Sequence, residues 1–278
     1  MRPARDLWAT YEPFHAVTYF TAEGRAAFDA VAYRGFWRGY FAGRTAPLGR
    51  TPAAVVTALY AGFAPRMVEK AIPAIWELAP PEKALEARLD GARAALGRLL
   101  AGRDTEVARA AALLREVTER SATSGRALGA ANAALPWPED PLGVLWQAAT
   151  TLRELRGDAH VLAQLAVGLD GLSTMVLRTG IDLDRAMLQP ARGWTDEEWD
   201  AVQRDLVLRG LMSADGVATI TGRAKLERAE ELTDDLAHEA WEAAGPETVA
   251  AFRAVAEPLS DLVRVELPAQ TPIALPTR

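Results

Sequence analysis

The 278-residue chain contains no cysteine. Disulfides, thiolate metal sites and cysteine nucleophiles are therefore excluded, and with only three histidines the supply of other metal ligands is small. The sequence also has no glycine-rich phosphate loop, no G-x-S-x-G nucleophile elbow, no H-E-x-x-H helix and no dinucleotide-binding fingerprint. We expect neither a metal nor a cofactor.

Long apolar runs and an excess of positive charge are also missing. No window approaches the run of about 18 apolar residues that spans a membrane, and the N-terminus lacks the apolar core of a secretion signal. We therefore expect a cytoplasmic protein without a membrane partner. The formal net charge is −6, whereas a domain that binds duplex DNA usually carries a basic surface that neutralises phosphates. The composition disfavours a nucleic-acid partner.

Helical periodicity dominates what the sequence does contain. Apolar residues recur at three- and four-residue steps through most of the chain. Thr51, followed by a proline, and Thr195, followed by three acids, have the pattern of helix N-caps. One short run, residues 217–221, favours a strand after the turn at residues 214–216.

Three prolines within residues 136–141 interrupt the helical pattern and predict an internal boundary. An N-terminal unit then covers residues 1–135 and a C-terminal unit covers residues 136–278. The second unit contains the strand-forming run, and the first has no clear counterpart to it. We expect two helical units of similar size.

The two units show a weak internal repeat. His15 precedes Thr51 by 36 residues, and His160 precedes Thr195 by 35 residues. A conserved offset of this kind is typical of a duplicated unit. The alternative is that amphipathic helices rich in Ala, Leu and Arg align with one another by chance.

The segment LVLRGLMSADGVATITGRAKLE, residues 206–227, resembles the end of the recognition helix, the wing and the next helix of a MarR-type winged helix-turn-helix. LGRTPAAVVTALYAGFAPRMVEKAIPAIW in the N-terminal unit looks like a helix-turn-helix whose wing has shrunk to residues 79–82. The whole chain resembles an actinobacterial family of MarR-like proteins of uncertain function, notably through HAVTYF, LRELRGDAHV and RGWTDEEW. This resemblance implies a mainly α fold with small β wings, in which two MarR-like winged-helix units form an internal pseudo-dimer.

Three positions depart from that family pattern. Its members more often have histidine where this chain has Leu155, glycine at Ala159 and glutamate at Ser173. All three positions lie within or close to the polar stretch TTLRELRGDAHVLAQL, residues 150–165. If they carry a family activity, that activity is altered or lost here.

The features that would read DNA are poorly developed. The candidate recognition helix begins TDEE at residues 195–198, which puts acids where a helix N-terminus would meet phosphate. The wing SADGVATITG contains no Arg or Lys. Arg66 and Lys70 offer positive charge in the N-terminal unit, but Pro73 interrupts the helix there. These patterns favour a winged-helix scaffold that has been reused for a small molecule.

Residues 150–165 supply the candidate catalytic group, because they place charged side chains in an otherwise apolar run. On a helix, Arg156 and His160 share one face, and Asp158 lies off to the side. We predict that His160, oriented by Asp158, moves a proton while Arg156 holds an anionic group. The alternative is a structural network of ion pairs, Arg156 with Asp158 and Arg153 with Glu154.

A pseudo-twofold arrangement of the units would bring further side chains to this site. His15 occupies the equivalent position in the first unit, and Tyr19 follows one turn later. Arg44 lies in a loop-like Gly/Arg/aromatic segment, RGYFAGRTAPLG. We predict that the substrate-binding residues are His15, Tyr19, Arg44 and Arg153.

Two functional interpretations follow. The first is a protein that binds or converts a small polar or anionic metabolite, such as a cofactor-independent acid–base enzyme of secondary metabolism that catalyses an elimination or a cyclisation. The second is a MarR-like, ligand-responsive transcriptional regulator in which the same pocket is a sensor. A homodimer or a paralogous partner chain is compatible with both.

Overall fold

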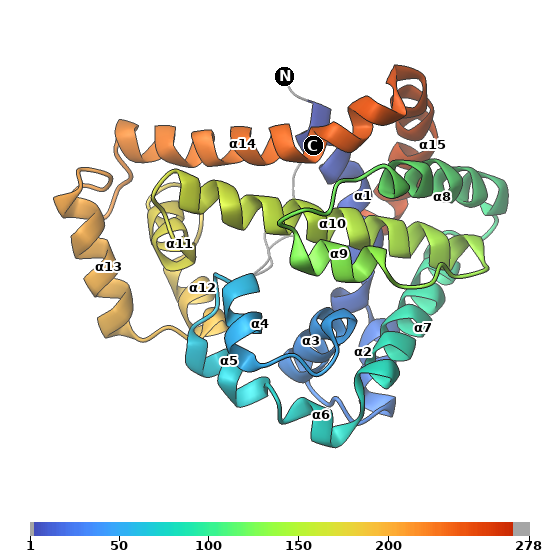
Figure 1. The fold of residues 1–278 in the computed structure, drawn as a ribbon, viewed down its shortest axis with the longest axis horizontal. Helices are drawn as coiled ribbons and strands as arrows, with labels where there is room; N and C mark the ends of the chain where they lie inside the picture. Colours follow the sequence, from blue (N-terminus) through green and yellow to red (C-terminus); the bar gives the residue numbers. More distant parts are fainter. Residues whose placement is uncertain (1–2, 269–278) are drawn as a thin grey trace.

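The computed structural model describes residues 3–268 and is almost entirely helical (Figure 1). The α-helices are α1 (Pro3–Phe20), α2 (Ala22–Ala30), α3 (Phe36–Thr45), α4 (Ala53–Leu59), α5 (Pro65–Ala71), α6 (Ile75–Leu78), α7 (Pro81–Leu99), α8 (Asp104–Glu119), α9 (Ala127–Ala133), α10 (Pro141–Ala166), α11 (Gly171–Thr179), α12 (Arg185–Arg192), α13 (Asp196–Leu208), α14 (Ile220–Ala244) and α15 (Pro246–Arg264). A short 3-10 helix, Ala46–Leu48, follows α3.

The mainly α prediction is confirmed, but the predicted β wings are wrong. Residues 3–268 contain no strand, and the only ladder contact among them is an isolated β-bridge between Met212 and Ala218. The run at residues 217–221 cannot extend as a strand because α14 begins at Ile220, where the Thr219 side chain accepts a hydrogen bond from Gly222 N–H. In the N-terminal unit, Pro81 opens α7 directly, so no wing forms there either.

The two predicted threonine caps have different outcomes. Thr195 caps α13 in a full capping box with Glu198, as the sequence predicts. Thr51 does not cap α4, because Pro52 occupies the N-cap position and the Thr51 hydroxyl donates to Leu48 O. The proline holds an extended backbone before the helix without any side-chain bond to it.

The long helix α10 lies at the centre of the molecule and packs against α1, α7, α8, α9 and α14 (Figure 1). The largest apolar cluster takes residues from both sides of the proline-rich segment, including Phe14, Leu114, Trp146 and Phe252. Helix α8 packs on α10, and α15 packs in the same way on α1. The duplication and the boundary between residues 135 and 136 remain predictions.

No single helix within residues 3–268 is long and apolar enough to cross a membrane. Taken together, α10 and α11 pass a test of length and composition, but the chain bends by 85° between them. Most of α10 is buried inside the protein.

Candidate functional site

A cavity of about 280 Å³ lies between α10, the α3–α4 region with the link to α5, and helices α11 and α12. Its charged lining consists of five arginines, one histidine and one carboxylate: Arg44, Arg153, Arg156, Arg178, Arg192, His160 and Glu230. Its aromatic lining consists of Trp8, Tyr40, Tyr60 and Phe63. The structure therefore brings together four of the predicted site residues, namely Arg44, Arg153, Arg156 and His160.

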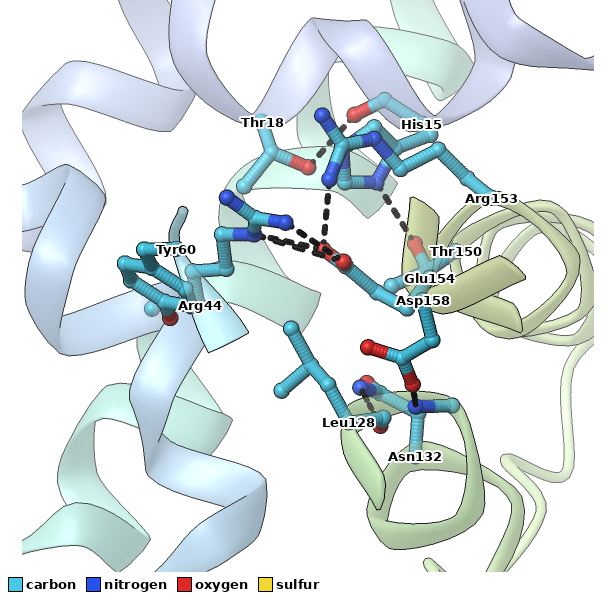
Figure 2. Close-up of polar contacts among 12 residues, drawn as sticks. His15, Thr18, Arg44, Tyr60, Leu128, Asn132, Thr150, Arg153, Glu154 and Asp158 are labelled. Atoms are coloured by element: carbon cyan, nitrogen blue, oxygen red, sulfur yellow. Dashed lines mark hydrogen bonds and ion pairs between the residues drawn. The ribbon is translucent and has the colours of Figure 1, made fainter. Parts of the chain in front are cut away.

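Glu154 anchors one wall of the cavity (Figure 2). Arg44 grips its carboxylate with Nε at 3.0 Å from Oε1 and Nη2 at 3.0 Å from Oε2, and Arg153 Nη1 donates to Oε1 at 2.9 Å. Burial alone would raise the pKa of Glu154, but Arg153 and Arg44 outweigh burial and hold the pKa at about 2. The Arg153–Glu154 pair is the one that the sequence suggested.

Arg156 pairs across the fold and not along its own helix. Its Nη2 lies 3.0 Å from Glu230 and 3.2 Å from Asp234, both on α14, and its guanidinium stacks 4.0 Å from the centre of the Trp8 ring. The predicted pair with Asp158 does not form. Arg156 Nε is buried without a hydrogen-bond partner.

His160 lies at the cavity wall with both ring nitrogens occupied. Thr233 Oγ1 donates to Ala229 O, so it accepts from His160 Nδ1 at 3.0 Å, and Gln164 Nε2 donates to His160 Nε2 at 2.7 Å. Burial lowers the pKa of His160, against the opposing effect of Glu230. These contacts hold a neutral imidazole.

Asp158 points away from the cavity, toward α9 (Figure 2). Its Oδ2 accepts the Gly129 N–H at 2.8 Å near the start of that helix. Burial raises the pKa of Asp158 to about 6, although this hydrogen bond opposes the shift. The prediction that Asp158 orients His160 is therefore wrong, because two residues along a helix turn the side chain to another face.

His15 and Tyr19 are buried on α1 and do not line the cavity. His15 Nδ1 lies 3.0 Å from Thr150 Oγ1, and burial, reinforced by Arg153, holds the pKa of His15 well below its usual range. The Tyr19 ring packs between His15 and Tyr40. Both residues support the cavity wall from behind.

Sequence reasoning missed several cavity residues, among them Tyr40, Arg192 and Glu230. The Tyr40 hydroxyl accepts a hydrogen bond from Arg44 Nη1 at 2.9 Å and a second from Arg192. Tyr40 could have been found, because it lies four residues before Arg44 on one helical face. Arg192 and Glu230 could not have been found, because only the fold brings these distant residues to the cavity.

None of the three departures from the resembled family lines the cavity. Leu155 is buried against Gly129 of α9, Ala159 is buried, and the Ser173 N–H binds the N-cap Asp170 of α11. Residues 3–268 contain no group of three or more His, Asp or Glu side chains that could hold a metal ion.

The sequence predicts two helix-turn-helix segments, which correspond to α4–α5 and α12–α13. These two segments contact each other directly. Arg66 on α5 binds both carboxylate oxygens of Glu198 on α13, at 2.7 and 2.6 Å. Trp194 Nε1 donates to Gly62 O, and Ala64 N donates to Arg192 O. These bonds join α5 and the link before it to the end of α12, the link after it and the first turn of α13.

Acids at the start of α13 are also paired locally. Arg185 binds Asp200 at 2.7 Å and Asp196 at 3.1 Å, and Gln189 donates to Asp196 at 2.8 Å. The N-terminus of the candidate recognition helix is therefore occupied by side chains of α5 and α12.

No curated protein and no solved structure gives a significant match to the chain. The model of a helix-turn-helix family matches residues 4–267, nearly the whole chain. The chain belongs to this helix-turn-helix family.

Proposed function

We propose that this protein binds a small anionic metabolite in the cavity beside α10. The observation that carries the proposal is the lining, in which five arginines face a single carboxylate, Glu230. Guanidinium groups recognise carboxylate and phosphate oxygens with paired hydrogen bonds. The aromatic side chains beside them suit a ligand that has a planar apolar part.

The charge balance of the walls supports an anionic ligand. Glu154 partly neutralises Arg44 and Arg153, Glu230 and Asp234 face Arg156, and Asp182 binds Arg178. Nearby, burial raises the pKa of Glu12, which weakens that carboxylate as a counter-charge.

Arg192 adds a further guanidinium to the same walls. It stacks 4.4 Å from the centre of the Phe63 ring and hydrogen-bonds the Tyr40 hydroxyl, which carries no charge as a phenol. A bound anion would offset the positive excess that remains.

Binding is better supported than catalysis by His160. Both nitrogens of its ring are engaged, and Asp158 contacts another helix. An elimination or cyclisation through this pair would need both side chains to move. Our hypothesis also includes a relationship to the MarR-like actinobacterial proteins and a role in secondary metabolism.

Regulation of transcription is the second candidate, and family membership favours it. A ligand-responsive regulator would use the same cavity as its sensor. Against direct DNA reading stand the acids of α13 and the Arg66–Glu198 bond, which holds the two helix-turn-helix segments together.

Calorimetric titration with benzoate and with benzamide tests the binding proposal. The two molecules have nearly the same shape, but only benzoate is charged, so benzoate should bind and benzamide should bind at least tenfold more weakly. Arg192→Gln should weaken benzoate by about tenfold or more, whereas Arg38→Gln, an exposed arginine on α3, should not. Titration with sulfate tests whether the cavity binds a compact anion. Equal binding of benzoate and benzamide, or binding of neither benzoate nor sulfate, would overturn the proposal.

A gel-shift experiment with the DNA upstream of the gene, repeated at several salt concentrations, separates the two candidates. A metabolite-binding protein without a DNA target gives no specific shift. Tight, salt-sensitive binding to one site would instead establish the regulator.

A further inference from the structure

Tyr40 has a hydrogen-bonding arrangement that its neighbours leave incomplete. A phenol oxygen can accept two hydrogen bonds and donate one. Within residues 3–268, the two partners of the Tyr40 oxygen, Arg44 and Arg192, are guanidinium groups, which donate and cannot accept. The proton of Tyr40 must therefore be directed at a third group or be lost.

The location of Tyr40 identifies where that third group lies. Tyr40 is almost fully buried on α3, and it lines the same cavity as the arginines. We propose that the Tyr40 hydroxyl is the group through which the cavity exchanges a proton, donating it to a bound anion and, in a cavity without an anion, releasing it as the pH rises. The part of this proposal that concerns the anion rests on the proposed function, and the release of the proton does not.

The surroundings of Tyr40 favour loss of the proton. The charged and titratable groups around it are Arg44 on α3, Arg192 on α12, Arg153 and Glu154 on α10, Tyr19 on α1 and Tyr60 after α4. Positive groups outnumber the one carboxylate. Burial alone would raise the pKa of Tyr40, but Arg44 and Arg192 outweigh burial, and the pKa is lowered.

The other tyrosines behave in the opposite way. The chain has five tyrosines. Burial raises the pKa of Tyr33 to about 12, and burial also raises the pKa of Tyr11, Tyr19 and Tyr60. Ionisation of Tyr40 can therefore be observed separately from that of every other tyrosine in the folded protein.

The proton balance with a ligand is simple. When Tyr40 is a phenol, its O–H donates to the anion and no proton enters or leaves. When Tyr40 is ionised, the arriving anion drives it back to the phenol, and one proton is taken up from water for each anion bound. The affinity for benzoate should then fall about tenfold for each pH unit above the midpoint of Tyr40 ionisation.

Ultraviolet titration of the intact protein, which detects phenolate absorbance, tests the proposal directly. We expect one tyrosine to ionise below pH 10, and Tyr40→Phe should remove that step. Tyr60→Phe is the matched control, because Tyr60 lines the same cavity and its hydroxyl pairs with Thr45. Arg192→Gln should move the midpoint to higher pH. The proposal is overturned if no tyrosine ionises below pH 10 or if the step survives in Tyr40→Phe.

Benzoate titrations at several pH values then test the ligand part. In the wild type the dissociation constant should rise with pH as stated, and in Tyr40→Phe it should stay flat. A pH dependence that persists in Tyr40→Phe overturns the proposed role. If the ultraviolet step is present and Tyr40-dependent but no anion binds, Tyr40 stands as the proton-releasing group and the proposed function fails.

Discussion

Glu154 and Asp158 are buried carboxylates one turn apart on α10, yet their pKa values move in opposite directions. Glu154 faces two arginines and has a pKa of about 2, whereas Asp158 faces a backbone N–H and has a pKa of about 6. Burial acts on both carboxylates in the same direction. The difference shows that full opposite charges overcome desolvation here, and that hydrogen bonds from backbone amides do not.

The largest expected effect comes from removing the Glu154 charge. Glu154→Gln leaves Arg44 buried without its counter-charge and Arg153 with only Glu12, 3.6 Å away, and should lower the free energy of unfolding by about 3–5 kcal/mol. Urea denaturation measures this change. The exposed pair of Glu86 with Lys83 provides the control, since Glu86→Gln should cost at most about 1 kcal/mol.

The same variant has a distinct pH signature. A carboxylate whose folded pKa is depressed stabilises the protein above its unfolded pKa, and this stability is lost as the pH falls through the folded value. The contribution of Glu154 should therefore disappear between about pH 4.5 and pH 2. An acid-stability profile of Glu154→Gln that matched the wild type in this window would contradict the assignment.

An intermediate effect is expected on the other side of α10. A Cβ on Gly129 would lie 2.4 Å from Leu155 Cδ2 and 2.8 Å from Leu155 Cα. Gly129→Ala should therefore push α9 away from α10, weaken the bond to Asp158 and lower the free energy of unfolding by about 1–3 kcal/mol. Gly97→Ala is a suitable control, because its Cβ would meet only Leu142 Cδ1, at an ordinary 3.6 Å. Equal stability of the two variants would show that α9 is not tightly packed here.

The smallest expected effect is a gain in stability. Asp158 has a raised folded pKa, so its contribution to stability is lost as the pH rises from about 4 to about 6. Asp158→Asn keeps an oxygen acceptor for Gly129 N–H and removes the buried charge, which should add about 1–2 kcal/mol at pH 8 and almost nothing at pH 4. Urea denaturation at both pH values measures the change, with the exposed Asp90→Asn as the control. A loss of stability at pH 8 would mean that the charged carboxylate is needed.

Local patterns predicted the parts of this fold that depend on nearby residues. The helix over residues 150–165 and the Thr195 cap follow from spacing and capping chemistry. The positions of Arg153 and Arg156 on α10 could be predicted for the same reason. The strand prediction was wrong because a competing local signal, the Thr219 cap, starts α14 inside the predicted strand.

The site itself depends on long-range contacts that spacing cannot supply. Arg44 meets Glu154 across 110 residues, and Arg156 meets Glu230 across 74. The partner of Asp158 could not be predicted either, because it lies on α9. Only the packing of the fold determines where α9 lies.

The Arg66–Glu198 bond determines which cations of the N-terminal unit are already paired within the chain. In the N-terminal unit, Arg66 is one of the few cations that could contact a phosphate, and it grips a carboxylate from the other unit with two parallel bonds. Glu198 therefore already binds, within the same chain, the two Arg66 donors that a phosphate would use.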